Sequence, residues 1–412
     1  MIHLPYISKE ECKMKKVLTA IIIAALCLSV LSIFTACGEK TVNGIELSGS
    51  VIEDQNVKNG SELPEDLKVN FVYSDGSKSE SVKVTSDMIS GFDTATDGRR
   101  TATVTYEGYT ATFDYRVYTN DIQLKFYDGN GTAESPYLIT TAEELQNISQ
   151  ATDAYFRLEI DIDMKGVEWT PVGNNIDEES IFSGNFNGNG RTISNLSVTN
   201  INSANWNEYK NTYNYAGMFG ASSGTISNLT LENCTLNVTD GSLSKRGDVY
   251  AGILVGQNFG DISGVTVKNS NITATGWLIC SAGALVGSNV GNIDSCNAES
   301  CEVSATSDGW TANAGGVVGA SGDRLYYTSA ASVTGSSAKN CTVYSEVKGE
   351  VTVDDIDYPS ATTYFGRVYA GGIGGLKVMT TYSDNTYENN DVSVKSYKSG
   401  EYIEYVGEEW GY

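Results

Sequence analysis

Hydrophobic and polar residues follow three different patterns along this chain. Residues 17–36 form an uncharged apolar run, residues 42–118 hold short β-forming stretches separated by turn residues, and beyond residue 120 short apolar segments recur at similar spacing. The second part has no helical period. The chain is therefore predicted to consist of an apolar N-terminal segment followed by two all-β parts.

The first segment has the features of a secretory signal. Two lysines precede the apolar run, and the small pair Thr35-Ala36 leads directly into Cys37. This arrangement resembles the lipobox of bacterial lipoproteins, except that Phe34 stands where that family usually has Leu. The resemblance implies that residues 1–36 are a signal peptide and that Cys37 is lipidated, so that the protein is anchored on the outer side of the bacterial membrane. The alternative is an uncleaved transmembrane anchor, because about 20 apolar residues can span a bilayer.

Residues 42–119 are predicted to form a small β-sandwich. Leu67–Tyr73 and Ser79–Val84 are separated by a Ser-Asp-Gly-Ser turn, and Thr101–Tyr106 is joined to Tyr109–Val117 through Glu-Gly. Glycine at such turns tolerates the positive φ that tight hairpins need. Several short strands in so few residues favour a sandwich.

The turn residues of this segment resemble those of bacterial Ig-like domains. The resemblance rests on Tyr73-Ser74-Asp75-Gly76, on Gly91-Phe92-Asp93 and on Thr103-Val104-Thr105-Tyr106-Glu107-Gly108. In that family the domain usually serves as a spacer in surface proteins. We therefore expect an Ig-like spacer here.

From residue 120 to residue 412 the chain is repetitive. The copies start at Ala216, Ala251, Ala282 and Ala314, each followed by Gly, and the later start at Ala370 follows an insertion. A second apolar segment and an Asn-x-x-apolar segment follow in each copy. Three short strands per repeat, separated by residues that accept left-handed backbone angles, predict one coil of a right-handed parallel β-helix, with six or seven coils in all.

Several motifs of this region resemble the GLUG-repeat β-helix. They are Gly129-Asn130-Gly131-Thr132-Ala133, Trp169-Thr170-Pro171-Val172-Gly173, Phe182-Ser183-Gly184-Asn185-Phe186-Asn187-Gly188-Asn189-Gly190 and Ile193-Ser194-Asn195-Leu196. Such β-helices occur in bacterial adhesins and in the N-terminal region of IgA-cleaving metallopeptidases. The catalytic domain of those peptidases has no counterpart in this sequence.

The two ends of a β-helix expose unpaired strand edges and are expected to be capped. At the front, Thr141-Ala142-Glu143-Glu144-Leu145 has the spacing of a capping box and predicts a short helix that ends near Gln150. At the back, the acidic and aromatic segment 401–412 is a candidate cover for the last coil. With both ends capped, a monomer is expected.

The net charge and the histidine count exclude several classes of function. The net charge is -24, and removal of residues 1–36 takes away four lysines and two glutamates and makes it -26. This charge argues against nucleic-acid binding. The only histidine, His3, is also removed. We therefore expect no imidazole-based catalysis and no histidine-ligated metal in the mature chain.

Five cysteines remain after residue 37, namely Cys234, Cys280, Cys296, Cys301 and Cys341. No CxxC pair suggests zinc. Cys234, Cys301 and Cys341 occupy the same repeat position. Two interpretations stay open: a disulfide between Cys301 and Cys341, or an interior stack of small side chains.

Acidic residues offer two candidate sites. Glu159, Asp161 and Asp163 alternate with apolar residues and could share one strand face, as paired acids do in β-helical enzymes that cleave polysaccharides. The competing interpretation is a solvated outer face. Two loop clusters, Asp177-Glu178-Glu179 and Asp354-Asp355-x-Asp357, could hold Ca²⁺ only weakly, and no cofactor or metal site is predicted.

Aromatic residues in the loops that join one repeat to the next are the leading candidates for ligand binding. They are Trp206, Tyr209, Tyr213, Tyr215, Tyr250, Trp277, Trp310, Tyr364 and Tyr369, and all precede an Ala-Gly segment. Equivalent positions of a solenoid lie on one side, so these rings could line a ridge on which sugar rings stack. Alternatively, they cover the coil beneath.

The sequence thus predicts a non-enzymatic, lipid-anchored surface protein that binds a glycan or a surface protein through these loops. A carbohydrate-active enzyme on the same fold and a purely structural spacer are the alternatives.

Overall fold

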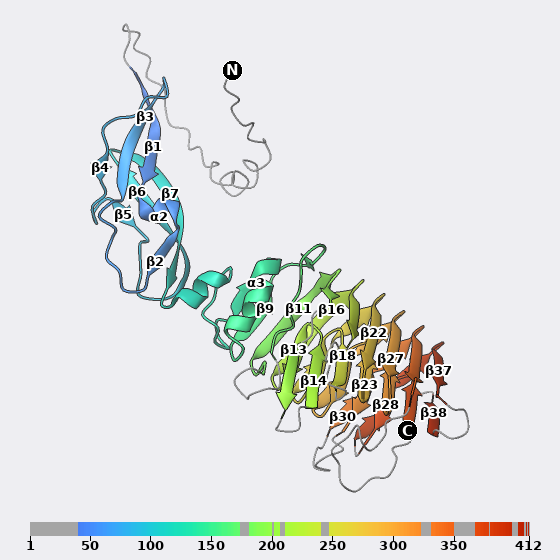
Figure 1. The fold of residues 1–412 in the computed structure, drawn as a ribbon. Helices are drawn as coiled ribbons and strands as arrows, with labels where there is room; N and C mark the ends of the chain where they lie inside the picture. The colour runs from blue at the N-terminus through green and yellow to red at the C-terminus, as the bar shows by residue number, and fades with distance from the viewer. Residues whose placement is uncertain are drawn as a thin grey trace, which may run out of the picture.

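The structure is a computed structural model that describes residues 40–173, 181–199, 202–206, 211–239, 247–322, 331–349, 367–378, 380–397 and 403–407, together with Glu409 and Gly411. A small two-sheet unit stands at one end of a long stack of β-coils (Figure 1). The fold is all-β, as predicted: an Ig-like sandwich followed by a parallel β-helix.

Two antiparallel sheets with one short parallel pair form the Ig-like unit. One has the order β1 (Val42–Ser48), β3 (Lys68–Tyr73), β4 (Val82–Lys83), and the other β2 (Asn56–Lys58), β7 (Tyr109–Tyr118), β6 (Gly98–Tyr106), β5 (Ile89–Ser90). A short helix, α2 (Ser50–Glu53), follows β1. The predicted hairpin between β6 and β7 is confirmed, because Glu107 and Gly108 have φ values of 48° and 85°.

The N-terminal end of the β-helix is capped by helices. The linker continues as η1 (Asp121–Lys125), and α3 (Ala142–Gln146) with η2 (Asn147–Gln150) covers the first strands. The predicted capping box is present: the Thr141 hydroxyl accepts a hydrogen bond from the Glu144 amide at 3.1 Å, and the Glu144 carboxylate accepts one from the Thr141 amide at 3.1 Å. Leu145 and Ile148 are fully buried in the core below.

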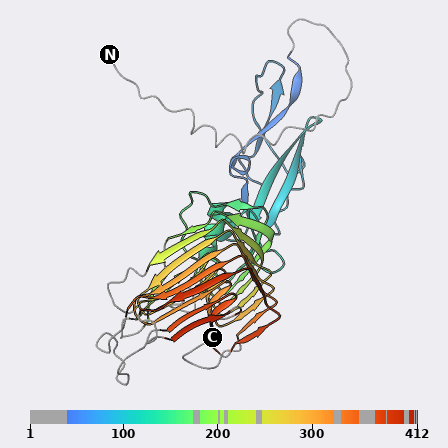
Figure 2. The ribbon, with the colours of Figure 1, turned by 90° about the vertical axis from the view of Figure 1, so that its right-hand side faces the viewer.

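Four sheets run along the β-helix, and successive coils stack strand upon strand (Figure 2). Sheet I contains β8 (Tyr137–Ile139), β9 (Tyr155–Leu158), β10 (Ile162–Asp163), β11 (Asn185–Ser194), β16 (Thr225–Glu232), β20 (Asp261–Ser263), β21 (Thr266–Lys268), β25 (Asn292–Asp294), β26 (Asn297–Glu299), β30 (Ser332–Thr334), β31 (Ser337–Lys339), β35 (Thr381–Ser383) and β36 (Thr386–Glu388). Sheet II contains β12 (Ser197–Val198), β17 (Thr235–Thr239), β22 (Asn271–Gly276), β27 (Glu302–Ser307), β32 (Thr342–Val347) and β37 (Asp391–Lys395).

The other two sheets form the opposite half of each coil. Sheet III contains β13 (Asn202–Trp206), β14 (Asn211–Ala216), β18 (Gly247–Gly252), β23 (Ile279–Gly283), β28 (Thr311–Gly315), β33 (Arg367–Gly371) and β38 (Ile403–Gly407). Sheet IV contains β15 (Phe219–Ser222), β19 (Val255–Asn258), β24 (Val286–Asn289), β29 (Val318–Ser321) and β34 (Gly374–Lys377). Neighbouring coils pair in parallel, except that β13 and β14 form an antiparallel hairpin.

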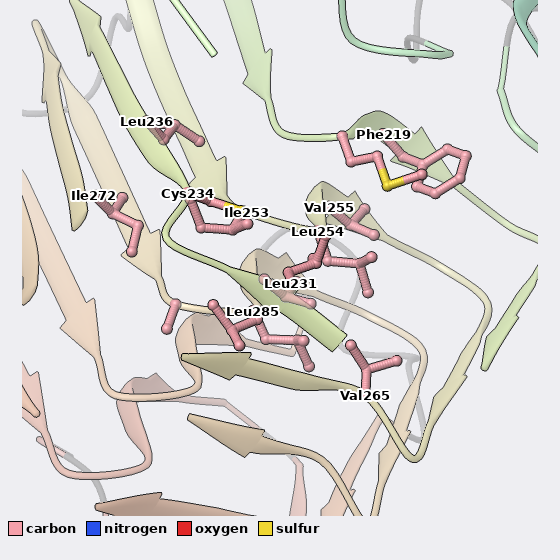
Figure 3. Packing of buried hydrophobic residues seen from close by; sticks show 14 of the residues in the cluster. Phe219, Leu231, Cys234, Leu236, Ile253, Leu254, Val255, Val265, Ile272 and Leu285 are labelled. Carbon is pink, nitrogen blue, oxygen red and sulfur yellow. The ribbon is translucent and has the colours of Figure 1, made fainter. Parts of the chain in front are cut away.

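The prediction of three strands per repeat is wrong, because a regular coil such as β20 to β24 has five. The Ala-Gly segment bends at Ile253-Leu254, which divides it between sheets III and IV, and both bend residues are fully buried (Figure 3). The second segment is interrupted by a left-handed residue, such as Gly264 with φ 61°. Periodicity located the apolar segments but did not reveal bends within them.

Left-handed residues separate sheet I from sheet II, as predicted. This position is occupied in successive coils by Asn233, Asn269, Ser300, Asn340 and Asn389, whose φ values are 55°, 52°, 52°, 54° and 54°. Asn tolerates this conformation better than most other residues because its short polar side chain can hydrogen-bond locally. The recurring Asn is therefore a requirement of the backbone.

The second glycine of the repeat allows two sheets to touch. A Cβ on Gly287 would lie 2.3 Å from the amide nitrogen of Ala251, and a Cβ on Gly319 would lie 2.5 Å from that of Ala282, where real Cβ atoms stay beyond 3.0 Å. Sheet IV of each coil thus lies directly against sheet III of the coil before it. These glycines are therefore required for the close packing of the two sheets.

The described residues of segment 401–412 lie on the last coil, as expected. Ile403–Gly407 forms β38 and pairs with β33, and the amides of Ile373 and Gly374 donate to the Glu409 carbonyl at 2.7 and 2.8 Å. One interior column contains Ala338 and then Tyr387, whose exposed fractions are 1% and 42%. Another contains Ala370 and then Val406, at 0% and 54%. The last coil therefore still exposes apolar side chains beside the described residues that lie on it.

Candidate ligand-binding surface

Three of the predicted aromatic residues occupy one column of sheet III. Tyr215 pairs with Tyr250 in the next coil, and their rings lie 5.9 Å apart at 17°. The column continues through Ser281 and Asn313 to Tyr369. The aromatic column is therefore interrupted at its centre by two small polar side chains.

The far end of this column contains a residue that was not among the predicted binding residues. Tyr369 stacks on Tyr405 of β38 with ring centroids 4.9 Å apart and ring planes 2° apart. Tyr405 lies outside the recognisable repeat, so only the strand register places it here. The spacing of Tyr-Ala-Gly at Tyr369 and Tyr-Val-Gly at Tyr405 was the signal that could have found it.

The tyrosines of this column differ in how far they are buried. Tyr215 and Tyr369 are 2% and 3% exposed, so they cover the coil beneath, as the competing interpretation stated. Tyr250 and Tyr405 are half-buried. The prediction of one continuous exposed ridge is wrong, because sequence alone could not tell a strand residue packed under its neighbours from a residue at a loop tip.

The two tryptophans lie in the turns between sheets II and III. Trp277 follows β22 and Trp310 precedes β28, and both are half-buried. They are not equivalent: Ile279 pairs with Thr311, which places Trp310 level with Leu278. The two turns nevertheless belong to adjacent coils, so the tryptophans lie on the same side of the β-helix, just before the strands that hold the tyrosine column.

Of the other predicted residues, some lie outside the described part of the chain, and for two only the backbone is described. Tyr209, Tyr364 and Cys37 lie outside the described residues, as do both loop clusters of acids. Trp206 and Tyr213 lie on the β13–β14 hairpin, where only the backbone is described. Ligand binding by these side chains and lipidation of Cys37 therefore stay predictions.

A half-buried aromatic ring beside polar groups can bind a flat ligand by stacking. Its exposed face accepts the C–H face of a sugar ring or an apolar side chain, and neighbouring amides and hydroxyls can hydrogen-bond. At the centre of the tyrosine column, the Asn313 amide donates to the Ser281 hydroxyl at 2.9 Å. Both side chains are 1% exposed, so this bond joins adjacent strands and does not reach a ligand.

The three acids do not form a site of paired carboxylates on one strand. β9 ends at Leu158 and β10 begins at Ile162, so the residues between them are not in a strand, and Ile160 is 49% exposed. The shared strand face is therefore not observed, and Asp161 and Asp163 are exposed, which agrees with the interpretation of a solvated outer face.

Each of these carboxylates instead has a local partner. Glu159 forms an ion pair with Arg157 at 2.7 Å, and Asp161 accepts a hydrogen bond from the Thr192 amide at 2.8 Å. Asp163 accepts one from the Asn195 amide group at 2.7 Å, and this bond lowers the pKa of Asp163. A lowered pKa is the opposite of what a general acid needs.

The five cysteines after residue 37 are free thiols in the interior. Cys301 and Cys341 occupy the same position in adjacent coils, in the column that also contains Cys234. The interior stack is thus the arrangement observed, and the disulfide is not present. Burial raises the pKa of Cys234 to about 11 and that of Cys280 to about 12, which makes both poor nucleophiles at neutral pH.

The described residues contain neither a metal site nor a membrane-spanning helix. No group of three or more Cys, Asp or Glu side chains there is arranged to hold a metal ion. In the same part of the chain, no helix is long and apolar enough to cross a membrane.

Fold and surface together define a bacterial Ig-like module followed by a parallel β-helix. Residues 63–117 match the family model of the bacterial Ig-like domain (group 3). Over 186 residues the chain is 36% identical to Halomucin of Haloquadratum walsbyi, which is 41% of this chain and 2% of that protein. Over 153 residues it is 31% identical to a protein of Evansella cellulosilytica assigned as a Gly-rich membrane protein, which is 35% of this chain and 16% of that one. The chain thus spans a small part of both relatives.

Solved structures show weaker likeness. A protein of Bacteroides ovatus assigned as an immunoglobulin A1 protease is 20% identical with a TM-score of 0.35, covering 69% of this chain and 87% of that one. An IgA1 protease is 12% identical with a TM-score of 0.25, covering 86% of this chain and 29% of that one. Neither likeness is close enough to support an argument about function.

Proposed function

We propose that this protein is a surface-associated binding protein, anchored by a lipid on Cys37, whose β-helix binds glycans or a protein on a neighbouring surface. The Ig-like domain acts as the spacer between anchor and β-helix. A bacterial Ig-like domain and a relative assigned as a membrane protein support the surface location. Adhesion is the function that fits a repetitive, non-catalytic surface held away from a membrane.

The observation that supports binding is the position of Trp277 and Trp310. Both are half-buried in the turns of adjacent coils, just before the strands of the tyrosine column, so each exposes part of its side chain on the same side of the β-helix. A sugar ring stacks on such a face through its C–H groups. We expect neutral or amidated sugars as ligands, because the net charge of -24 disfavours polyanions.

Glycan-array binding by the full chain tests the proposal. Changing Trp277→Ala or Trp310→Ala should weaken binding, because stacking faces are lost. Tyr155→Ala is the matched control, since Tyr155 is 41% exposed but lies on β9 of sheet I. Equal binding by all three variants and the parent chain would disprove the role of this surface.

The carbohydrate-active enzyme remains the second candidate and has a separate test. Incubation of the full chain with polysaccharides should release no reducing sugar. Release that is lost in Asp161→Asn or Asp163→Asn would overturn the proposal in favour of the enzyme.

A further inference from the structure

The first described residues of the chain are held against a turn of the Ig-like unit. The Lys40 ammonium lies 2.9 Å from the Asp75 carboxylate and donates to the Ser77 hydroxyl at 2.9 Å. Beside it, the Ser74 amide donates to the Thr41 carbonyl oxygen at 2.8 Å. These contacts fix the polypeptide from residue 40 onward to the turn that follows β3.

Aromatic side chains gather around this entry point. Tyr109, at the start of β7, is 37% exposed, and its hydroxyl donates to the Val42 carbonyl oxygen at 3.5 Å. The Phe71 ring contacts Tyr106 and Tyr109, with ring centroids 5.0 and 5.9 Å away. Tyr73 and Tyr106 are half-buried. We define the tip of the Ig-like unit as these three tyrosines together with Lys40, Thr41 and the turns at residues 74–77 and 107–108.

The tip lies at the end of the Ig-like unit that is remote from the β-helix (Figure 1). β7 runs from Tyr109 at the tip to Tyr118 beside the linker, and its ten residues span about 30 Å. The short strand β2 pairs with the far end of β7, where Lys58 lies opposite Tyr118. The tip and the β-helix are thus at opposite ends of one strand.

The proposed anchor limits how far the tip can be from a membrane. Only Gly38 and Glu39 separate Cys37 from Lys40, and an extended chain covers at most about 11 Å over three residues. Because Lys40 is fixed to the tip, a lipid on Cys37 brings the tip to the headgroup region. Tyrosine is enriched in this region because it combines an apolar ring with a polar hydroxyl.

The charges of the tip permit contact with phospholipid headgroups. Lys40 pairs with Asp75, and Lys78 next to the turn pairs with Glu46 at 2.7 Å. Together with Glu107 these side chains have a net charge of only -1, whereas the whole chain has a net charge of -24. An acidic surface is repelled by anionic headgroups, and a nearly neutral aromatic surface is not.

We propose that the tip of the Ig-like unit docks on the phospholipid headgroups of the membrane that holds the anchor, with Tyr73, Tyr106 and Tyr109 at headgroup level. Docking rests on the proposed function, because it requires the lipid on Cys37. The Ig-like unit then stands upright, and β7 leads away from the membrane. The β-helix is held at a fixed height above the membrane instead of moving on a loose tether.

Fluorescence quenching by spin-labelled lipids tests the docking. The lipidated full chain is placed in vesicles of phosphatidylethanolamine and phosphatidylglycerol that contain a lipid with a nitroxide on its headgroup. A bimane label is attached at Ser74→Cys in the tip or at Lys58→Cys, the matched control at the other end of the unit. Both positions are exposed, and the five cysteines after residue 37 are buried and stay unlabelled. Quenching should be several-fold stronger at Ser74→Cys, and equal quenching at the two positions would overturn the docking.

Substitution of one ring separates contact by the tip from mere closeness to the membrane. In the Ser74→Cys background, Tyr109→Ser should lower the quenching, because the ring that favours the headgroup region is lost. Tyr109→Trp should keep it, since Trp favours the same region. Tyr155→Ser, at a position that is 41% exposed on β9, should have no effect. Unchanged quenching in Tyr109→Ser would overturn the role of the aromatic side chains.

Vesicle flotation distinguishes failure of the docking from failure of the anchor. The parent chain should float with the vesicles, and Cys37→Ala should stay in the soluble fraction. Equal flotation of the two would overturn the anchor, and the docking with it. A parent chain that floats through Cys37 but shows equal quenching at the two labelled positions would overturn the docking alone.

Discussion

The guanidinium of Arg116 joins the two parts of the molecule through the carbonyl oxygen of Phe126. Arg116 belongs to β7 of the Ig-like unit and is 4% exposed, whereas Phe126 lies in the core of the β-helix and is 2% exposed. The Arg116 side chain donates to the Phe126 oxygen at 2.5 Å and to the Gly129 oxygen at 3.0 Å, and it lies 3.6 Å from the Asp128 carboxylate. The linker is therefore held by buried hydrogen bonds.

Removing this side chain should loosen the junction. Arg116→Ala deletes both hydrogen bonds and leaves the buried Phe126 carbonyl without a partner, at a cost of about 1–3 kcal/mol. We expect broader distance distributions between spin labels on the two units and faster proteolysis between residues 119 and 129. Arg100→Ala is the control, because Arg100 donates to the Thr96 carbonyl within the Ig-like unit. A distribution as narrow as that of the control would contradict this role.

Adding one methyl group to a glycine of sheet IV should destabilise the β-helix. The Cβ of Gly287→Ala would meet the Ala251 amide at 2.3 Å. Because the contact is with backbone, the coils must separate, and we expect a loss of about 1–3 kcal/mol in the free energy of unfolding. Gly44→Ala should be nearly neutral in the same denaturant titration, since nothing lies within 4 Å of its Cβ position. Similar unfolding midpoints for the two variants would count against the close approach.

Substitutions at the left-handed positions should change the free energy of unfolding in opposite directions, depending on the residue introduced. Asn269→Ala should lower the free energy of unfolding by about 1 kcal/mol, because a left-handed conformation is costly for a residue with a Cβ and no local hydrogen bond. Ser300→Gly should raise it, since its φ is 52° and glycine carries no such cost. Asn271→Ala, two residues further along on the exposed side of β22, is the control. The same thermal unfolding series for all three variants checks the order.

The buried thiols should not react with alkylating reagents while the protein is folded. Alkylation at pH 8, followed by peptide mapping, should leave Cys234, Cys280, Cys296, Cys301 and Cys341 unmodified until denaturant is added, because all five are buried. All five should react after unfolding under non-reducing conditions. A missing reaction at Cys301 and Cys341 together would instead reveal a disulfide between them.

The same thiols predict a dependence of stability on pH. Burial raises the pKa of Cys280 and Cys296 to about 12 from an ordinary value of 9.0. Above pH 9.0 the unfolded chain releases these protons while the folded chain keeps them, so the free energy of unfolding should fall as the pH rises toward 12. Cys280→Ala with Cys296→Ala should make this decline shallower in denaturant titrations. An unchanged slope would show that other groups cause the alkaline loss.

Much of the fold could be predicted from local chemistry. The hairpin at Glu107-Gly108, the capping box at Thr141 and the left-handed asparagines were all visible in the sequence, because each depends on the conformational preference of a few adjacent residues. The recurrence of Ala-Gly was likewise enough to indicate stacked coils. These features need no information about distant residues.

The candidate site depended on tertiary structure. Tyr215 and Tyr369 precede Ala-Gly segments just as Trp277 and Trp310 do, yet the tyrosines are buried in a strand column and the tryptophans are half-buried in turns. Likewise, the hydrogen bond that lowers the pKa of Asp163 most comes from Asn195, which is one coil away. By itself the sequence determined an all-β, repetitive, acidic chain without histidine after His3. Which side chains reach solvent was decided by contacts between coils about 31 or more residues apart, and local preferences do not encode such contacts.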